Sequence, residues 1–376
     1  MHKLSTTDRR SFLASALAAG SYAALAGGGP RAAASAAQEE PPRRLPALKV
    51  ARDRRIRTVV GLRPYRAEGF VLTNERLGEK VVVHNYGHGG GGVSLSWGVA
   101  LLAAEQARNL EDQAVAVLGC GVVGLSTART LQRRGKAVTL YTRELPPETT
   151  SNVAGALWYP THVYDPQRVT PTFVERFGLA CRLAHREFQS YVGAEYGVRW
   201  METYTLRTEP EPPGHEPIGG AELYPEIRRY ADARTFFGYS HIRRFTSLMI
   251  EPQTYLRALL RDFYTAGGRL VVRELKTREE VAQLPERVIF NCTGLGARGL
   301  FGDQGLASMR GQIEVLLPQP ELDYCYLANS LYMFPRADGV ILGGTFEAGN
   351  WSMDPDAATT TRIIDGNAQI ARGLRR

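Results

Sequence analysis

Short apolar runs bounded by glycine, proline or polar residues recur along this chain, and each run has the length of a buried strand. The runs occupy residues 80–83, 114–118, 137–141, 288–290, 311–316 and 340–343. Two of them lead directly into glycine-rich turns, and a helical pattern follows each turn. Strands that alternate with helices in this way indicate an α/β fold built on a parallel sheet.

Three segments show helical patterns. Residues 93–107 are apolar on nearly every side, which predicts a buried helix. Residues 122–133 predict a second helix that ends before a glycine, and residues 251–265 predict an amphipathic helix closed by two glycines. The stretch up to about residue 244 is rich in proline, tyrosine and charge, and its helical and extended signals are mixed.

The first glycine-rich turn lies in HNYGHGGGGVSLSWG, residues 84–98. No Gly-Lys-Ser/Thr follows it, so it is not a phosphate-binding P-loop. Its glycines would let bare backbone approach a flat ligand, and the helix that begins near Val93 would direct free N–H groups at that ligand. A flavin ring gathers negative charge at N1 and O2 on reduction, which suits a helix N-terminus. A flexible glycine hinge is the alternative interpretation.

The second turn has the spacing G-x-G-x-x-G within VAVLGCGVVGLSTA, residues 115–128. Gly119 permits the tight turn, Gly121 lets the backbone approach a pyrophosphate, and Gly124 lets helix and strand pack closely. The helix N-terminus then faces the phosphates. The motif is weak alone, but its place between a strand and a helix predicts a dinucleotide site. A glycine turn without a ligand is the alternative.

The acidic residue expected at the end of the next strand, where it would bind a ribose, is absent. Thr142 and Arg143 stand there, with Glu144 just beyond. A threonine hydroxyl hydrogen-bonds a ribose less strongly than a carboxylate does, whereas Arg143 could serve a 2′-phosphate. NADP is therefore a rival to FAD at this point.

Composition narrows the class of protein. A chain of 376 residues suffices for two lobes, and an apolar content of 44% supplies a core. The formal net charge is +8, but no basic run with interleaved aromatic residues appears, so nucleic-acid binding is not expected. Seven scattered histidines without HxxxH or CxxC spacing predict no metal site. The four cysteines show no paired spacing and are interpreted as buried thiols: Cys120, Cys181, Cys292 and Cys325.

The N-terminus has the pattern of an export signal. Arg9 and Arg10 precede a weakly apolar Ala/Gly stretch, and Ala34-Ser35-Ala36 suits a signal peptidase. Residues 1–36 therefore resemble a twin-arginine signal peptide, which carries folded proteins out of a bacterial cytoplasm, and residues 37–46 are a polar, proline-rich linker. We expect a secreted or cell-envelope protein without a stable membrane span. A membrane anchor or a chance arginine pair is the alternative.

The two glycine motifs belong to a larger set that resembles the D-amino-acid oxidase family. HNYGHGG followed by a Ser and a Trp-Gly helix looks like the family's C-terminal signature, and VVGLRPYR (residues 59–66) looks like the segment just upstream of it. The resemblance covers roughly residues 47–376, and its motifs are specific in combination. The other matches are VLGCGVVGLSTA, TTSNVAGALWYP (149–160), NCTG (291–294), RGQIEV (310–315), SLYMFPR (330–336) and LGGTFEAGNW (342–351).

The order of these segments departs from the family. The GLRP and HNYGHGG segments end the family's chains but begin this one, and residues 359–376 resemble the stretch just before GLRP. The resemblance therefore implies a circular permutant. Such a rearrangement is physically reasonable because the buried helix runs back beneath the sheet to where the first strand begins, and a connector at residues 109–113 can join them.

The resemblance implies an active site that is partly intact. Arg63 would form a bidentate pair with the substrate carboxylate, the Tyr332 hydroxyl would assist it, and the Gly90 carbonyl would accept a hydrogen bond from the substrate amine. An ordinary surface arginine and an ordinary strand tyrosine are the alternatives.

Other pocket positions differ from the family. Ala328 stands where the family has a lid tyrosine, with Tyr326 nearby as a substitute. Tyr159 and Thr161 replace a glutamine and a tyrosine. These changes leave the identity of the substrate side chain open, but they do not affect the residues of the reaction core.

The resemblance also implies which residues hold FAD. Gly119, Gly121 and Gly124 would meet the pyrophosphate, and Arg143 would lie near the adenosine. The remaining contacts would come from five other segments, namely Thr149 and Thr150, Ala156 and Leu157, Leu275, Thr293 and Gly294, and Gly91, Gly92, Val93 and Ser94.

We therefore expect an α/β fold with two discontinuous lobes and the flavin at their interface. Residues 70–142 and 251–302 would form a Rossmann-like FAD-binding domain, and residues 47–69, 143–250 and 303–376 a substrate domain with a large mixed sheet. A homodimer is an open expectation.

The activity implied is that of an FAD-dependent oxidase of D-amino acids. The family mechanism moves a hydride from substrate Cα to flavin N5, the imino acid hydrolyses to a 2-oxo acid and ammonia, and molecular oxygen is reduced to hydrogen peroxide. No side chain need act as a base, which fits a pocket without an obvious histidine or carboxylate candidate. Three alternatives stay open: an oxidase of glycine or N-methyl amines, an NAD(P)-dependent dehydrogenase, and a non-catalytic flavin-binding protein.

Overall fold

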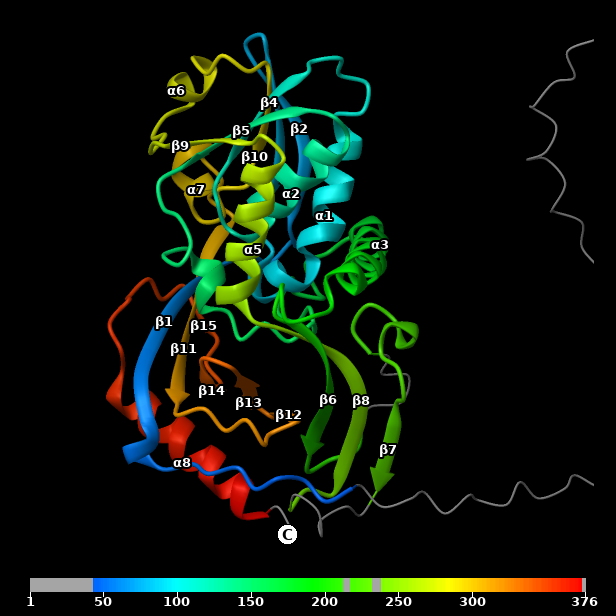
Figure 1. Cartoon of the computed structure of the whole chain (residues 1–376), viewed down its shortest axis with the longest axis vertical. Helices are drawn as coiled ribbons and strands as arrows, with labels where there is room; N and C mark the ends of the chain where they lie inside the picture. The colour runs from blue at the N-terminus through cyan, green and yellow to red at the C-terminus, as the bar shows by residue number, and fades with distance from the viewer. Residues whose placement is uncertain (1–42, 212–216, 232–237, 374–376) are drawn as a thin grey trace, which may run out of the picture. The chain divides into compact units, whose positions relative to one another are not determined.

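The computed structural model describes residues 43–211, 217–231 and 238–373, which fold around two β-sheets (Figure 1). The predicted signal peptide, residues 1–36, lies outside the described residues. The described end of the predicted linker is packed against the fold, because Leu45 is buried and the Pro46 carbonyl accepts a hydrogen bond from the Tyr324 hydroxyl at 3.1 Å.

The first sheet has six strands in the order β2-β3-β10-β4-β5-β9. All neighbouring pairs are parallel except β2 and β3, which form an antiparallel hairpin. A parallel sheet needs crossover connections that cover its faces, and helices supply them here. The strands are β2 (Val71–Leu77), β3 (Lys80–Tyr86), β4 (Ala114–Leu118), β5 (Ala137–Thr142), β9 (Arg269–Val272) and β10 (Val288–Asn291).

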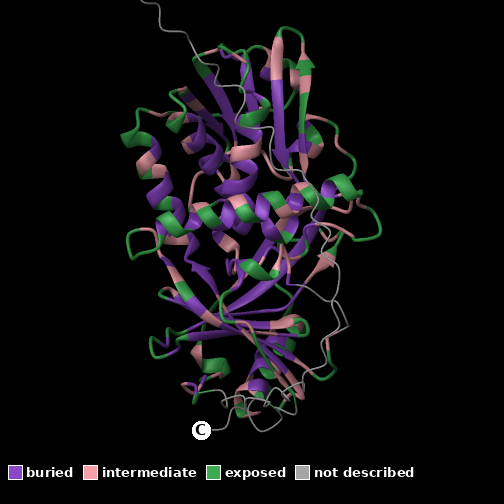
Figure 2. Ribbon diagram, turned by 90° about the vertical axis from the view of Figure 1, so that its right-hand side faces the viewer, coloured by how far each residue is buried: buried purple, intermediate pink, exposed green. Residues whose placement is uncertain are grey.

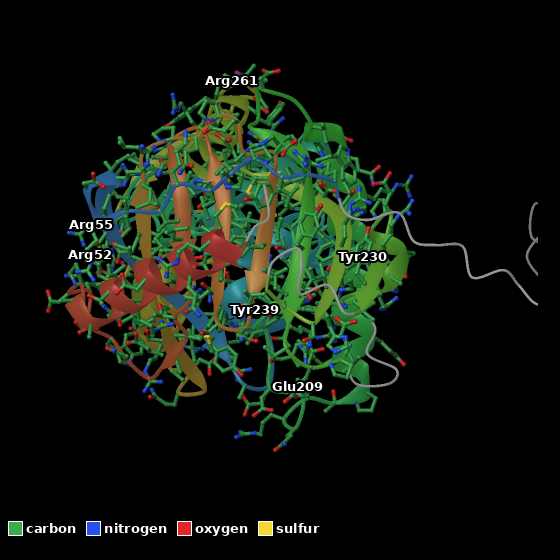
Figure 3. All side chains as sticks on the ribbon, turned by 90° about the horizontal axis from the view of Figure 1, so that it is seen from below. Arg52, Arg55, Glu209, Tyr230, Tyr239 and Arg261 are labelled. Carbon is green, nitrogen blue, oxygen red and sulfur yellow. The ribbon has the colours of Figure 1, made fainter. Side chains whose placement is uncertain are left out.

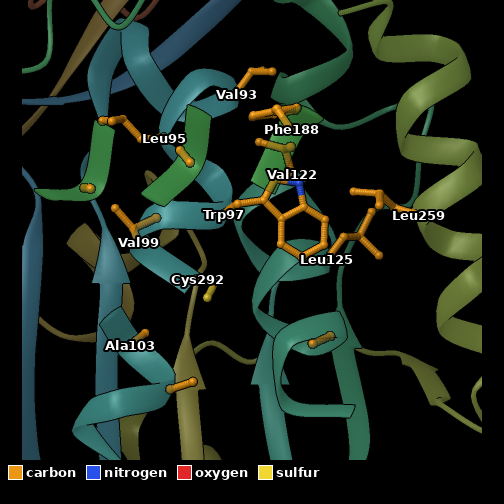
Figure 4. Close-up of a cluster of buried hydrophobic side chains, with 14 of the residues drawn as sticks. Val93, Leu95, Trp97, Val99, Ala103, Val122, Leu125, Phe188, Leu259 and Cys292 are labelled. Carbon is orange, nitrogen blue, oxygen red and sulfur yellow. The ribbon is translucent and has the colours of Figure 1, made fainter. Parts of the chain in front are cut away.

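Helices α1 (Gly92–Gln106), α2 (Val122–Arg133) and α5 (Pro252–Thr265) stand together beside this sheet, and α3 (Pro171–Phe188) packs on α1 (Figure 1). The core between them centres on the fully buried Trp97 (Figure 4). Its ring stacks on Tyr191, with 4.9 Å between ring centres. Helix α1 is buried on nearly all sides because helices cover it in addition to the sheet, which explains its lack of a polar face. Two short helices, α6 (Arg278–Ala282) and α7 (Gly296–Leu300), flank β10.

The second sheet has nine strands, with β1-β11-β14-β13-β12-β6-β8-β7 in order and β15 paired to β11. It is mixed, because β12 and β6 run parallel whereas the other pairs are antiparallel. Its strands are β1 (Arg55–Arg66), β6 (Val198–Arg207), β7 (Arg228–Ala231), β8 (His241–Ile250), β11 (Leu306–Leu316), β12 (Tyr324–Ala328), β13 (Leu331–Arg336), β14 (Gly339–Gly343) and β15 (Glu347–Ala348).

Helix α8 (Ala357–Gly373) covers the outer face of the large sheet (Figure 1). Arg52, in the segment that leads into β1, pairs with Asp365 of α8 at 3.1 Å, and both Arg52 and Arg55 lie at the surface (Figure 3). The inner face carries a second apolar cluster around Tyr332 and Phe334. Buried residues follow the central strands of both sheets (Figure 2). Short 3-10 turns complete the fold at Arg52–Arg54, Gly89–Gly91, Thr150–Val153, Gln189–Tyr191 and Ala221–Leu223.

The predicted α/β fold is confirmed, and each sheet draws its strands from the segments expected for one of the two lobes. The four cysteines are free and buried, as predicted. In residues 43–211, 217–231 and 238–373, no helix has the length and apolar character needed to cross a membrane, and no three histidine, cysteine or acidic side chains gather as metal ligands.

Candidate active site

A cavity of about 1360 Å³ is lined by the carboxyl ends of the parallel strands and by the inner face of the large sheet. Ligands of open α/β sheets bind at the carboxyl ends of the strands, so this position is where a dinucleotide site is expected. The cavity extends from the dinucleotide turn at Gly119 and Gly121 to Arg63 and Tyr332.

The turn between β4 and α2 forms a backbone cradle. Gly119 has a φ of 99°, and a Cβ there would lie 2.6 Å from the Cys292 carbonyl oxygen. A Cβ on Gly124 would lie 1.9 Å from the Gly119 carbonyl oxygen, so helix and turn can touch only through glycine. Gly121 faces the cavity at the N-terminus of α2. These features fit a pyrophosphate held by backbone N–H groups.

The end of β5 carries charges that balance one another. The Arg143 guanidinium pairs with the carboxylates of Glu144 at 3.0 Å and Glu274 at 3.3 Å. The Thr142 hydroxyl donates to the Glu144 carbonyl oxygen at 2.7 Å. Arg143 therefore offers no excess positive charge to a 2′-phosphate, and two carboxylates stand near the place that the missing ribose-binding acid would occupy.

The first glycine motif lies against residues 161–163. The Gly90 N–H donates to the His162 carbonyl at 3.0 Å, and a Cβ on Gly90 would lie 2.6 Å from the Thr161 carbonyl oxygen. Helix α1 follows directly, and the Ser94 hydroxyl donates to the Leu157 carbonyl at 3.3 Å. The two segments contact each other directly, and bare backbone from both lines the cavity, so a flat ring system can approach them closely.

Arg63 on β1 and Tyr332 on β13 meet at the inner face of the large sheet. Arg63 Nη1 donates to the Thr345 carbonyl at 3.2 Å, and the guanidinium lies 4.9 Å from the centre of the Phe346 ring. Burial raises the pKa of Tyr332, and the nearby Arg63 charge partly opposes that rise.

Two glycines make room for this pair on neighbouring strands. A Cβ on Gly311 would lie 2.4 Å from Arg63 Nη2, and a Cβ on Gly343 would lie 2.2 Å from the Tyr332 hydroxyl oxygen. The guanidinium and the phenol therefore lie directly over bare backbone. The arrangement can hold a carboxylate, because Arg63 presents a planar fork of donors and Tyr332 adds a hydroxyl.

The cavity contains histidine and carboxylate side chains, contrary to the sequence prediction. His88, His162 and Glu211 all line it. Burial lowers the pKa of His88 to about 3. The His162 ring stacks on Phe346, and burial together with the Arg63 charge lowers its pKa to about 4, although part of its surface is exposed. Both imidazoles are neutral at pH 7.

Most of the predicted site residues line this one cavity. Gly91 and Gly124 do not, because their Cβ positions face Val163 and Gly119 respectively. The residues that do line it are Arg63, Gly90, Gly92, Val93, Ser94, Gly119, Gly121, Arg143, Thr149, Thr150, Ala156, Leu157, Leu275, Thr293, Gly294 and Tyr332.

The suggested substitute for the lid tyrosine lies elsewhere. The Tyr326 hydroxyl donates to Asn367 of α8 at 2.7 Å, and the side chain is fully buried on the outer side of the large sheet. Ala328 lies on that same side, because side chains two residues apart along a strand share a face. Neither residue lines the cavity.

Three residues that no sequence pattern assigned to the site also line the cavity, namely Arg243, Glu211 and Phe346. Arg243 belongs to a stretch whose helical and extended signals are mixed, so its direction was not predictable. The composition of FTSLMI, residues 245–250, is the signal that could have placed it on a strand, because phenylalanine, threonine and isoleucine favour strands.

A dinucleotide cradle, a backbone-lined slot and a carboxylate-binding pair within one cavity define an FAD-dependent oxidoreductase. Comparison with known proteins agrees. Residues 114–374 match the family model DAO, described as FAD dependent oxidoreductase. The chain belongs to this family.

Relatives with curated names include D-amino-acid oxidases and a D-aspartate oxidase. The enzyme of Rubrobacter xylanophilus is 36% identical over 256 residues, which cover 66% of this chain and 74% of the relative. The enzyme of Streptomyces coelicolor is 32% identical, with coverages of 67% and 76%. The D-aspartate oxidase of Homo sapiens is 29% identical, with coverages of 68% and 75%.

Solved structures share the fold at low sequence identity. Glycine oxidase from Geobacillus kaustophilus superposes with a TM-score of 0.51 at 16% identity, covering 68% of this chain and 77% of that one. The FAD-bound L-alpha-glycerophosphate oxidase from Mycoplasma pneumoniae gives 0.50 at 14% identity, covering 71% and 80%. The family match, described as FAD dependent oxidoreductase, identifies FAD as the cofactor of this chain, and NADP is set aside.

Proposed function

We propose that this enzyme oxidatively deaminates D-amino acids to 2-oxo acids and ammonia, with molecular oxygen reduced to hydrogen peroxide. The observation that carries the proposal is the contact between Arg63 and Tyr332 in the cavity that also holds the dinucleotide turn. The two residues come from β1 and β13, so the fold brings them together from distant parts of the chain.

Substrate binding would use three groups. The Arg63 guanidinium would pair with the α-carboxylate, and the Tyr332 hydroxyl would donate to the same carboxylate. The Gly90 carbonyl would accept from the α-amino group and so set the direction of the Cα–H bond. Backbone at Ala156 and Leu157 would contact the ring system of the flavin.

When bound, FAD supplies the two-electron acceptor for the hydride of Cα. The protein's part is to position the substrate. His88 and His162 are neutral, so the cation that faces the substrate carboxylate is Arg63. A neutral amine is needed for hydride loss, and the Gly90 carbonyl favours an amine that keeps N–H groups to donate. The apolar residues around Tyr332 exclude water from the reacting bond.

We also propose that the chain is a circular permutant of its family. The family match begins at residue 114, the first residue of β4, although the residues before it form β1, β2, β3 and α1 of the same two sheets. The matched part covers about three quarters of each curated relative, which leaves a quarter for segments that stand at the other end.

The test of function is anaerobic reduction of the protein-bound flavin. Protein purified with FAD should lose its flavin absorbance on mixing with a D-amino acid and regain it on admission of air, with peroxide formed. The L-enantiomer is the control. Bleaching by glycine or an N-methyl amine alone would favour the alternative oxidase, and no bleaching by any amine would leave a flavin-binding protein without this activity.

A further inference from the structure

The cavity has a second polar end on strand β8, away from Arg63. Arg243 points into it with only 4% of its surface exposed. Its Nη2 donates to the Tyr159 hydroxyl at 3.2 Å, and its Nη1 lies 2.7 Å from Glu211 Oε1. A buried arginine in a ligand cavity requires an explanation, because ordering and desolvating it is costly.

The hydrogen bonding of this group is incomplete. Neither Nε nor Nη1 of Arg243 has an acceptor in line with its N–H, and Glu211 Oε2 has no hydrogen-bond donor. Oε2 also forms an ion pair with the largely exposed Arg229, whose Nε lies 3.5 Å away. Arg243 Nε and Glu211 Oε2 therefore lack hydrogen-bond partners at the same place, and Nη1 has only its ion pair with Glu211.

Sheet register connects this end of the cavity to the carboxylate-binding end. Arg243 pairs with Thr205, Thr205 with Leu327, and Leu327 with Tyr332. Residues paired across strands share a face, and all four line the cavity. Three strand spacings of roughly 4.8 Å separate the Cα atoms of Arg243 and Tyr332, about 14 Å. Their long side chains shorten that gap to the length of a small ligand.

Tyr159 fixes the direction of the arginine. Its ring stacks on Phe245, two residues along β8, with 5.8 Å between ring centres. The Arg243 guanidinium lies 5.6 Å from the centre of the same Phe245 ring. Tyr159 is one of the positions at which the sequence departs from the family that it resembles, and its side chain holds this arginine in place.

The charge balance selects the ligand. Inside the cavity Arg243 and Glu211 form a neutral pair, and Arg229, which also contacts Glu211, is largely exposed to screening by water. A second carboxylate would therefore meet repulsion from Glu211 without a free buried cation to offset it. Arg207 also lines this end of the cavity, but its Nε donates to the carbonyl oxygen of Glu209 at 3.3 Å. Glu209 lies at the surface (Figure 3). A neutral group that both accepts and donates matches the unsatisfied atoms, and a primary carboxamide is such a group.

We propose that Arg243, Glu211 and Tyr159 form a side-chain subsite for a primary carboxamide, so that the preferred substrates are D-asparagine and D-glutamine. The amide oxygen accepts from Arg243, and the amide nitrogen donates to Glu211. This assignment rests on the proposed oxidase function, because that function places the α-carboxylate at Arg63.

Turnover tests the assignment with substrates of matched shape. D-Glutamine should have a kcat/KM roughly tenfold or more above that of D-glutamate, and D-asparagine should exceed its near-isostere D-leucine by a similar factor. Arg243→Met should abolish both preferences while changing D-alanine turnover by less than about threefold. Glu211→Gln should shift the preference from D-glutamine toward D-glutamate, because it removes the repelling charge.

Arg229→Met is the matched control. Arg229 is the register partner of Arg243 and lies beside Glu211, but it does not line the cavity, so its loss should leave the preferences unchanged. D-Glutamate or D-leucine oxidised as well as the corresponding amide, or preferences that survive Arg243→Met, would overturn the subsite.

Ligand binding separates this inference from the proposed function. Succinamate, succinate and 4-methylpentanoate have the same shape and cannot be deaminated, and each can be titrated against the visible spectrum of the bound flavin. Tightest binding by succinamate, lost in Arg243→Met, supports the subsite even if no D-amino acid is turned over. Tightest binding by succinate or 4-methylpentanoate refutes it, even if D-amino acids are oxidised.

Discussion

Arg63 shows how one guanidinium depends on its neighbours. It is held by two carbonyls and an aromatic ring, and it lies over a strand that has glycine at the point of contact. None of these contacts neutralises its charge, so the cation is available to a carboxylate. Its motif made the role predictable, but Thr345 and Phe346 come from a loop far along the chain, and no pattern in the sequence connects them to Arg63.

Removal of Arg63 should act on the substrate rather than on FAD. Arg63→Ala should lower kcat/KM for a D-amino acid by about a hundredfold or more, since losing a desolvated bidentate partner costs roughly 3–5 kcal/mol. Arg63→Lys should recover only part of this, because an ammonium lacks the planar fork. Steady-state kinetics and the flavin spectrum measure the two effects.

Arg57→Ala serves as the control for Arg63, because Arg57 lies on the same strand and is half exposed beside Asp338. Unaltered turnover in Arg63→Ala would mean that another cation binds the carboxylate.

His88 should make the protein less stable in acid. Its pKa in the fold is about 3, below the ordinary value near 6.5, because burial disfavours the charged form. Between these values the unfolded chain binds the proton and the folded chain does not. The free energy of unfolding therefore decreases as pH falls from about 6.5 toward 3.

Chemical denaturation of the wild-type protein and of His88→Gln at several pH values measures this contribution. The variant should lose less stability than the wild type over that range. Parallel curves for the two proteins would contradict the prediction. His84 and His185 also have lowered pKa values, so the difference between the proteins carries the test rather than the slope of either one.

Among the strands and helices, the sequence pattern predicted correctly those elements that are buried on one face or on all sides. Strand β4 and helix α2 match the predicted residues 114–118 and 122–133, because a glycine turn separates two runs of clear period. Strand β1 was not predicted, since its arginines leave most positions only partly buried. Strand β11 begins at Leu306, earlier than residue 311, because its first half pairs with β1 rather than β14.

Contact between α2 and its preceding turn should not tolerate a methyl group. In Gly124→Ala the new Cβ would overlap the Gly119 carbonyl, so the helix must shift away from the turn. Overpacking of this kind costs about 1–3 kcal/mol. We expect a lower melting temperature and weaker FAD retention during dialysis, measured by thermal unfolding and by the flavin-to-protein absorbance ratio.

Gly178→Ala offers a comparison for Gly124→Ala. That glycine lies within α3, where a Cβ would meet only the end of the Arg182 side chain, and alanine should be neutral or slightly stabilising. Equal FAD retention in Gly124→Ala and Gly178→Ala would show that the turn is not part of the cofactor site.

For the whole molecule, we propose export by the twin-arginine route, on the basis of Arg9 and Arg10 before a weakly apolar stretch. Replacing both arginines by lysine should leave uncleaved precursor in the cytoplasm, because this route reads the arginine pair. Immunoblots of cytoplasmic and exported fractions measure the outcome. A variant with Lys3→Arg and Arg10→Lys keeps the number of arginines and the charge but separates the pair, so it controls for charge. Normal export of the double-lysine protein would point to another route.

The strand order of the smaller sheet has a consequence for the growing chain. Strands β3 and β4 leave the ribosome early, yet their common neighbour β10 is made more than a hundred residues later, and it lies between them. Until then the sheet consists of two parts with open edges, the condition in which strands pair wrongly. Nascent chains halted before Val288 should therefore be cleaved rapidly by protease, and chains extended past Gly294 should resist it. In this enzyme the central strand completes the sheet, so the cofactor can be captured only after most of the chain has been synthesised.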